Sequence, residues 1–371
     1  MIEKRNMAGN ECSLLGFGCM RFPTKGGKID EQKAAQMIDE AMKAGINYYD
    51  TAYFYHNGDS ERFLGKVLPK YPRDSYYLTS KLPVGLLTSR EHAQEVLSEQ
   101  LERLNADYLD YYLLHAIGGK SFDEKVLGFD LISLCEEWKA QGKIRHFGFS
   151  FHDDFPAFER ILRHYPWDCC QIQYNYLDTE NQAGEKGLKL AGELGIPVIV
   201  MEPIRGGALV RFPEEIKNEF LAVNPRRNLA NMALSWVGTH EEVKVILSGM
   251  SNLTQLRDNL KTFRHFTPLT DEEMAGVTRV VELIRARVRV PCTACRYCMP
   301  CPRGVDIPRA FHIDNEEAMH GHTQVYRAQY LRGKVESLAS ACVGCGVCKT
   351  KCPQHIDIPA RLAEVKARFE D

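Results

Sequence analysis

Eight of the thirteen cysteines in this 371-residue chain lie in two quartets near its C-terminal end. The first quartet keeps two residues between successive cysteines, and it consists of Cys292, Cys295, Cys298 and Cys301. The second lengthens its last gap to three residues, and it consists of Cys342, Cys345, Cys348 and Cys352. In a C-x2-C-x2-C-x3-C-P run, three thiolates hold one iron–sulfur cluster and the fourth cysteine ligates the other cluster. We therefore expect two [4Fe–4S] clusters that exchange their fourth ligands, so that Cys352 completes the first set and Cys301 the second.

The two quartets belong to an internal repeat, CTACRYCMPCPRGVDIPRAF and CVGCGVCKTKCPQHIDIPARL. Both halves end in D-I-P, and because proline suits the first turn of a helix, each triplet predicts a helix start and a mainly helical region between the halves. A four-cysteine zinc site is the alternative, but zinc does not account for a third x-x-spaced cysteine and a C-P pair in both halves. The short gap before Cys301 either weakens the second cluster or only reshapes the turn at Pro300.

A second set of chemical groups follows three β-rich runs. Asp50 comes after NYY, Lys81 after YYLTS and His115 after YLDYYLL, and Tyr55 lies one short loop beyond Asp50. Catalytic groups of a parallel barrel gather at the C-terminal ends of its strands, so we expect these four to converge. Lys81, held by Asp50, would lower the pKa of the Tyr55 phenol. His115 would orient a carbonyl oxygen, which Tyr55 would protonate as a hydride arrives at carbon.

These groups need a scaffold of alternating strands and helices. We expect strands over 14–18, 47–52, 76–81, 108–115, 144–150, 169–175, 197–202 and 243–249. Helical patterns separate them, such as the one that begins after Asp30 and ends at Gly45. Eight such pairs predict a (β/α)8 TIM barrel over 1–266, then a linking helix over 267–290 and a small mainly α-helical domain over 291–371. An open doubly wound sheet is the alternative, but no G-x-G-x-x-G turn follows the first strand. Residues 1–13 predict a hairpin that closes the barrel floor.

Composition and charge limit the kinds of molecule that we expect the protein to bind. The formal net charge of −2 gives no reason to expect nucleic acid or an anionic membrane as a partner. No apolar run is long enough to span a bilayer, and MIEKRNMAGN lacks the apolar core of a secretory signal. Cysteines clustered at x-x spacing indicate metal binding in a reducing compartment. We therefore expect a cytoplasmic protein.

The motifs DTAYFY, SKLP and LDYYLLHA resemble the catalytic motifs of the aldo-keto reductase superfamily, and SERFLG and MKAGINYYDTA are also similar. The resemblance covers roughly residues 1–265. It implies a (β/α)8 barrel that reduces a small carbonyl compound with NADP(H) or NAD(H), through the catalytic tetrad Asp50, Tyr55, Lys81 and His115. The tail resembles an α-helical ferredoxin, and barrel-plus-cluster reductases form a subgroup of this superfamily.

The same resemblance implies a set of cofactor contacts. It places Ser150 and Gln171 at the carboxamide, and Asp258 and Asn259 at the adenosine end. Gly206 and Gly207 would let backbone approach the pyrophosphate, although a plain tight turn is the alternative. Met20 is a candidate for the pocket at the barrel mouth, as are Arg21, Tyr53 and Phe54. The chain departs from the family pattern at three places. Phe151 stands where asparagine is common, Glu202 and Pro203 where an aromatic residue often stacks, and Gly249 and Gln255 where basic residues often grip a 2′-phosphate.

The clusters raise a further question, because a cluster passes one electron while a nicotinamide passes a hydride. Three roles for the clusters are open. They would stabilise the fold of the tail, relay electrons from a ferredoxin or other redox protein, or exchange electrons with a flavin at the barrel mouth. No motif indicates a flavin, although phosphate loops of such barrels can hold flavin mononucleotide. The alternative function is an electron-transfer protein that couples a ferredoxin-type partner to a nucleotide- or flavin-binding barrel. The Tyr55–Lys81 pair argues against it, because a binding module needs no such pair.

Overall fold

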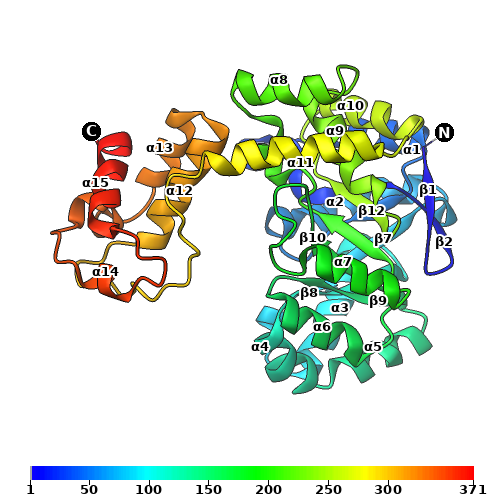
Figure 1. The fold of residues 1–371 in the computed structure, drawn as a ribbon. Coiled ribbons are helices and arrows are strands. Elements are labelled where there is room, and N and C mark those ends of the chain that lie inside the picture. Colours follow the sequence, from blue (N-terminus) through cyan, green and yellow to red (C-terminus); the bar gives the residue numbers. More distant parts are fainter. Residues whose placement is uncertain (1) are drawn as a thin grey trace. The chain divides into compact units, whose positions relative to one another are not determined.

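The computed structural model describes residues 2–371, and Figure 1 shows its fold. Eight strands form a closed barrel in the order β10–β11–β12–β3–β6–β7–β8–β9. They are β3 (Leu15–Gly18), β6 (Tyr48–Asp50), β7 (Tyr77–Leu82), β8 (Leu109–Ile117), β9 (Ile144–Phe151), β10 (Cys169–Gln173), β11 (Val198–Met201) and β12 (Val243–Ser248). All neighbouring pairs are parallel. Each strand overlaps a predicted one, so the TIM-barrel prediction is confirmed.

Helices alternate with these strands along the chain. They are α1 (Glu31–Ala44), α2 (Asp59–Val67), α3 (Arg90–Leu104), α4 (Gly119–Ser121), α5 (Leu131–Ala140), α6 (Phe155–His164), α7 (Gly184–Glu193), α9 (Leu229–Thr239) and α10 (Leu253–Arg264). The predicted caps of α1 are present, since Asp30 accepts a hydrogen bond from the Lys33 amide and Gly45 ends the helix at φ 96°. Glycine suits that left-handed position because it lacks a Cβ. A small antiparallel pair, β4 (Thr24–Lys25) and β5 (Lys28–Ile29), precedes α1.

A hairpin of β1 (Lys4–Met7) and β2 (Asn10–Ser13) precedes the first barrel strand. Its Met7 and Cys12 are fully buried in one cluster with the barrel side chains Tyr48, Tyr111 and Cys169. The Tyr111 hydroxyl donates to the Met7 carbonyl over 2.9 Å. The predicted hairpin at the barrel floor is therefore confirmed, and it buries the base of the barrel interior.

The chain divides into two compact units. One consists of the chain up to Gly206 with Arg227–Glu272, and the other of Gly207–Arg226 with Glu273–Asp371. The predicted barrel domain, 1–266, also includes 207–226, a segment that belongs to the second of these units. The segment carries α8 (Glu214–Val223), which packs on α11 (Asp271–Ala286). The Cβ of any larger residue at Gly276 would lie 2.8 Å from Val223, and the Asn224 side chain donates to Glu273 over 2.6 Å.

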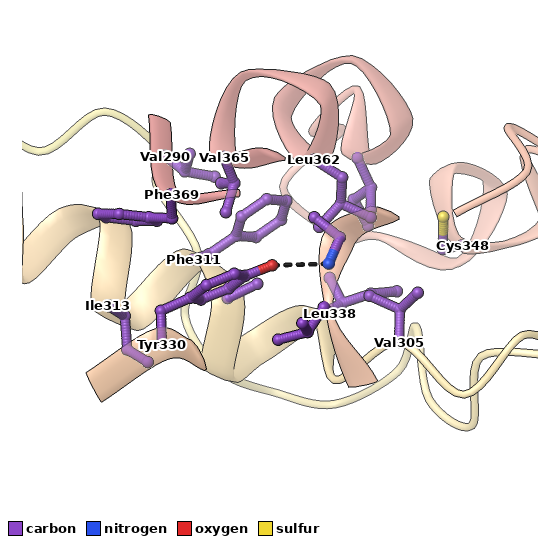
Figure 2. Packing of buried hydrophobic residues seen from close by; sticks show 14 of the residues in the cluster. Val290, Val305, Phe311, Ile313, Tyr330, Leu338, Cys348, Leu362, Val365 and Phe369 are labelled. Carbon is purple, nitrogen blue, oxygen red and sulfur yellow. Dashed lines mark hydrogen bonds between the residues drawn. The ribbon is translucent and has the colours of Figure 1, made fainter. Parts of the chain in front are cut away.

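The C-terminal residues form α12 (Ile307–His320), α13 (Thr323–Leu331), α14 (Val347–Lys351) and α15 (Ile358–Phe369). Asp306 and Asp357 cap α12 and α15, with proline in each first turn, as the D-I-P triplets predict. Their apolar side chains share one core, in which the Ala339 amide donates to the Tyr330 hydroxyl over 2.6 Å (Figure 2). The mainly helical prediction is confirmed. Across residues 2–371, no helix is both long and apolar enough to span a bilayer.

Candidate active site and iron–sulfur centres

The four predicted catalytic residues converge at the C-terminal ends of β6, β7 and β8. Lys81 donates to the Asp50 carboxylate over 2.6 Å and to the Thr51 carbonyl over 2.8 Å. Its Nζ also lies 3.4 Å from the Tyr55 hydroxyl. The Tyr55 and His115 rings meet edge to face, with centroids 6.1 Å apart. Parallel register brings these residues together, since Asp50 pairs with Thr79 and Lys81 with Leu113.

Burial strongly affects the protonation states of these four residues. It raises the pKa of Asp50, against the opposing charge of Lys81. For Lys81, burial disfavours the charge, but Asp50 and Tyr55 outweigh it and raise the pKa. Burial, together with smaller effects of the charges of Lys81 and His152, lowers the pKa of His115 to about 3. His115 is therefore a neutral imidazole at physiological pH.

The pKa of Tyr55 corrects one detail of the sequence prediction. Burial raises this pKa above its ordinary value, and Lys81 lowers it only in part. The expected influence of Lys81 is present, but the net direction is upward because the phenolate is poorly solvated. At neutral pH Tyr55 therefore carries its proton, which is the form that a general acid needs.

The sequence does not predict a buried network that lies behind the tetrad, although the SERFLG motif contains its central residue, Glu61. Glu61 is fully buried and accepts hydrogen bonds from Ser80, Gln100 and Arg103. Gln100 also donates to the Lys81 carbonyl over 3.2 Å. These contacts fix the end of β7 and with it the backbone of Lys81. The sequence does contain a signal for this network. Glu61 falls on the buried face of α2, and a buried carboxylate needs hydrogen-bond partners.

Gln171 and Ser150 lie on adjacent strands at the same depth, because their Cα atoms are register partners between β10 and β9. Both are 1% exposed. The Ser150 hydroxyl accepts from the Ala116 amide over 2.7 Å. The Gln171 Oε1 is buried and has no hydrogen-bond partner within residues 2–371. A buried carbonyl oxygen without a partner is costly, so it fits a ligand that donates an amide N–H at this point, as a nicotinamide carboxamide would.

Three of the other predicted contact positions lie at loops after strands. Gly206 follows β11 at φ 62° and Gly207 follows it at φ 97°. A Cβ at Gly206 would lie 3.2 Å from the Arg21 guanidinium, and one at Gly249 would lie 3.1 Å from the Arg21 stem. Exposed Met20 immediately precedes Arg21. Arg21 thus lies between the loops after β11 and β12, which is where such barrels bind phosphate.

The remaining predicted contacts already have partners within the protein. Both oxygens of Asp258 accept from the Asn228 side chain, at 3.0 and 3.1 Å. Asn259 is 6% exposed and donates to the Ser248 hydroxyl over 2.9 Å. Tyr53 donates to Glu99 over 2.9 Å rather than facing an open pocket. Phe54 differs, since it is 48% exposed and its ring lies 6.4 Å from that of His115.

The cysteines of the first expected set line one small pocket. Its lining includes Cys292, Cys295, Cys298 and Cys352. The fourth cysteine of the second half has therefore joined the three of the first, as the ligand exchange predicts. Among residues 2–371, no group of three or more His, Cys, Asp or Glu side chains could hold a single metal ion. An open space among four thiols suits a cubane, in which each thiolate binds a different iron.

The second expected set lines a separate small pocket. Its lining includes Cys301, Cys342, Cys345 and Cys348. Cys301 reaches this cavity despite its short gap, and the preceding Met299–Pro300 bond is cis. Of the two explanations for the short gap, the reshaped turn is the one that matches this geometry.

Comparisons with known proteins agree with both halves of this description. Residues 14–282 match the model of the aldo/keto reductase family, and residues 291–356 match that of a 4Fe-4S dicluster domain. L-galactose dehydrogenase of Arabidopsis thaliana is 26% identical over 299 residues, which cover 75% of this chain and 93% of that protein. The NADH-specific methylglyoxal reductase of Escherichia coli is 26% identical over 299 residues, covering 67% of this chain and 89% of that protein.

A solved structure also matches. An aldo-keto reductase from Bacillus halodurans, in its holo form, superposes with a TM-score of 0.65 and 29% identity, and the match covers 76% of this chain and 96% of that one. The family model spans well over half of the sequence, and it includes Asp50, Tyr55, Lys81 and His115. The chain therefore belongs to the aldo/keto reductase family and carries a C-terminal 4Fe-4S dicluster domain.

Proposed function

We propose that this protein is an NAD(P)H-dependent reductase of a small aldehyde or ketone, that Tyr55 is its general acid, and that its eight clustered cysteines hold two [4Fe–4S] clusters. The observation that carries the reductase proposal is the buried chain of contacts from Asp50 through Lys81 to Tyr55. A binding module has no use for a buried ammonium beside a phenol. The alternative electron-transfer function does not account for this pair.

The residues divide the reaction between them. A bound nicotinamide supplies the hydride that adds to the carbonyl carbon. Neutral His115 donates a hydrogen bond to the carbonyl oxygen and thereby orients it. Tyr55 gives its proton to that oxygen, which completes the alcohol, and Lys81 stabilises the phenolate that remains until water returns the proton. Asp50 keeps Lys81 charged and in place.

Two observations bear on the cofactor. Gln171, with its unpaired buried Oε1, and the neighbouring Ser150 would hold the carboxamide. Arg257 is a positively charged residue in the segment where the family often binds a 2′-phosphate. Its Nε and Nη2 already donate to Glu40, over 2.8 and 2.9 Å. This pairing favours NADH. Values of kcat/KM for NADH and NADPH, each with the same aldehyde, test the preference.

Tyr55→Phe tests the reductase proposal. Aldehyde reduction should fall by about 10²- to 10⁴-fold with either nucleotide, which is the usual contribution of a positioned general acid. Tyr71→Phe is the matched control, since Tyr71 lies away from the site and bonds to Asp39. Full activity in Tyr55→Phe would remove Tyr55 from its role. Iron and sulfide analysis of anaerobically purified protein, with EPR, tests the clusters, for which two cubanes require about eight irons.

A further inference from the structure

The two cysteine-bearing segments have a charge that differs from that of the whole chain. Residues 291–305 and 342–356 contain no aspartate or glutamate, but they contain Arg296, Arg303, Lys349 and Lys351. All four side chains are exposed. Lys349 pairs with Asp357 at 2.6 Å, whereas Arg296, Arg303 and Lys351 make no ion pair in the part of the chain that the structure describes. These two segments therefore present exposed cations and no carboxylate, although the chain carries a formal charge of −2.

Large apolar side chains are exposed in the same segments. Tyr297 is 66% exposed between Cys295 and Cys298. Val343 is 62% exposed beside Cys342, and Val347 is 42% exposed beside Cys348. Many apolar side chains of the neighbouring helices are buried in the core drawn in Figure 2, although Val325 and Leu331 of α13 are also exposed. Exposed apolar side chains that have charged neighbours are a feature of protein-binding sites.

The exposed cysteines lie among these side chains. Cys295 is the exposed member of the first quartet and Cys345 that of the second. Arg296 lines the first cavity, while Arg303 and Val343 line the second. A protein that docks on these residues would therefore lie close to the groups held by the cysteines. We call the exposed residues Arg296, Tyr297, Arg303, Val343, Val347 and Lys351 the cluster face.

We propose that the cluster face is the docking site of a small acidic protein that carries one electron at a time. The inference rests on the proposed pair of [4Fe–4S] clusters. In each encounter one electron leaves the reduced carrier and enters one oxidised cluster, so the carrier is oxidised by one electron and no bond breaks. Positive charge steers an acidic partner and accelerates association, and the exposed apolar side chains stabilise the small interface that is typical of transient redox encounters.

Charge reversal tests the electrostatic part. Arg296→Glu/Lys351→Glu changes the cluster face, and Arg332→Glu/Lys366→Glu changes the same net charge at other exposed positions of this unit. Both are compared with the unchanged full-length chain after anaerobic purification, iron and sulfide analysis, and EPR of the dithionite-reduced protein. A pre-reduced, small acidic [4Fe–4S] ferredoxin is the probe, and stopped-flow absorbance gives its rate of cluster reduction. A basic c-type cytochrome, as an acceptor from the reduced chain, is the comparison carrier.

Reversal of the cluster face should slow reduction by the ferredoxin roughly 10-fold or more at low ionic strength, and the difference should disappear at high salt. The control variant should keep the rate of the unchanged chain, and the cytochrome should react faster with the reversed face. Equal effects in both variants, or no effect in either, would overturn the proposal. If reversal lowers iron content, Arg296→Gln/Lys351→Gln provides the same comparison with a smaller change in charge.

A second readout separates docking from a local effect of the cations on the clusters. Calorimetry measures the Kd of the oxidised ferredoxin for the oxidised chain, and an EPR-monitored titration measures the cluster potentials. We expect the reversed face to weaken binding at unchanged potentials, and Tyr297→Ser to weaken it with no change in salt dependence. Shifted potentials with an unchanged Kd would mean that the cations serve only the clusters. Absence of clusters in the unchanged chain would instead refute the cluster proposal itself.

Discussion

Phe212 stacks on His320, with ring centroids 5.0 Å apart and planes at 26°. Phe212 lies on the segment between β11 and α9, and His320 is the last residue of α12. Each is 1% exposed. A segment that follows the seventh strand of the barrel therefore packs on a helix of the unit that carries the cysteine quartets.

This stacking leads to a prediction about stability. Phe212→Ala should destabilise the C-terminal unit by about 3–5 kcal/mol, because it leaves a cavity beside His320. Hydrogen exchange should accelerate in α12 and remain unchanged in β6, β7 and β8. Leu194→Ala, at a 41% exposed position, is the control and should change neither. Faster exchange confined to the barrel strands would contradict the assignment of this segment to the C-terminal unit.

The buried ion pair of the tetrad leads to a second prediction. Asp50 and Lys81 have side chains that are 2% and 1% exposed, so removal of one partner strands a buried charge. Asp50→Asn should lower the free energy of unfolding of the barrel by about 3–5 kcal/mol. Asp50→Asn/Lys81→Met should be less destabilised, because it removes the charge as well. Urea unfolding measures both, and a double variant as unstable as the sum of its single variants would show that the pair is not coupled.

His115 makes the stability of the barrel depend on pH. Its pKa is about 3 in the folded protein and 6.5 without the fold. The contribution of the neutral imidazole to the free energy of unfolding is therefore complete above pH 6.5, and it is lost as the pH falls toward 3. Between pH 7 and pH 5 the unchanged protein should lose up to about 2 kcal/mol more than His115→Gln. Urea unfolding across this pH range measures the difference. Parallel losses in the two proteins would mean that His115 is not held neutral by the fold.

The proposed exchange of cluster ligands has a spectroscopic consequence. Cys301→Ala and Cys345→Ala should perturb the same cluster, and Cys295→Ala and Cys352→Ala should perturb the other. EPR of the reduced variants should therefore sort the four spectra into these two pairs. If Cys301→Ala instead matched Cys295→Ala, each half of the repeat would serve its own cluster.

Gln171 offers a test of the cofactor site that does not depend on turnover. Gln171→Met should weaken NADH binding by about 1 kcal/mol, roughly fivefold, through the loss of one hydrogen bond. Without nucleotide the variant should be no less stable than the unchanged protein, because its buried oxygen has no partner to lose. Fluorescence titration and thermal unfolding measure the two effects. Destabilisation without any loss of NADH affinity would assign Gln171 to the protein core.

Local patterns in the amino-acid sequence predict much of the architecture. Alternation of apolar runs and helical segments predicted the barrel, because parallel strands buried on both faces need that pattern. The positions of Asp50, Lys81 and His115 at strand ends predicted their convergence, since the carboxyl ends of parallel strands meet at one mouth. Cysteine spacing predicted the exchanged quartets, because x-x spacing restricts which thiolates can reach one cluster. The short gap before Cys301 did not keep it from its quartet.

Other features depend on contacts between residues far apart in sequence. Asn259 matches a cofactor-binding motif, yet its amide bonds to Ser248. The pKa of Tyr55 could not be given a net direction from its neighbours alone, because burial outweighs the charge of Lys81. Nothing in the sequence around Phe212 indicates that it packs on a helix of the cysteine-bearing unit. Sequence by itself determined the fold and predicted which tetrad residues and which cysteines lie together, because both follow from spacing and strand direction. Only the tertiary structure decided which polar groups are buried and which side chains they bond to. Both depend on the side chains, distant in sequence, that surround a group and exclude water from it.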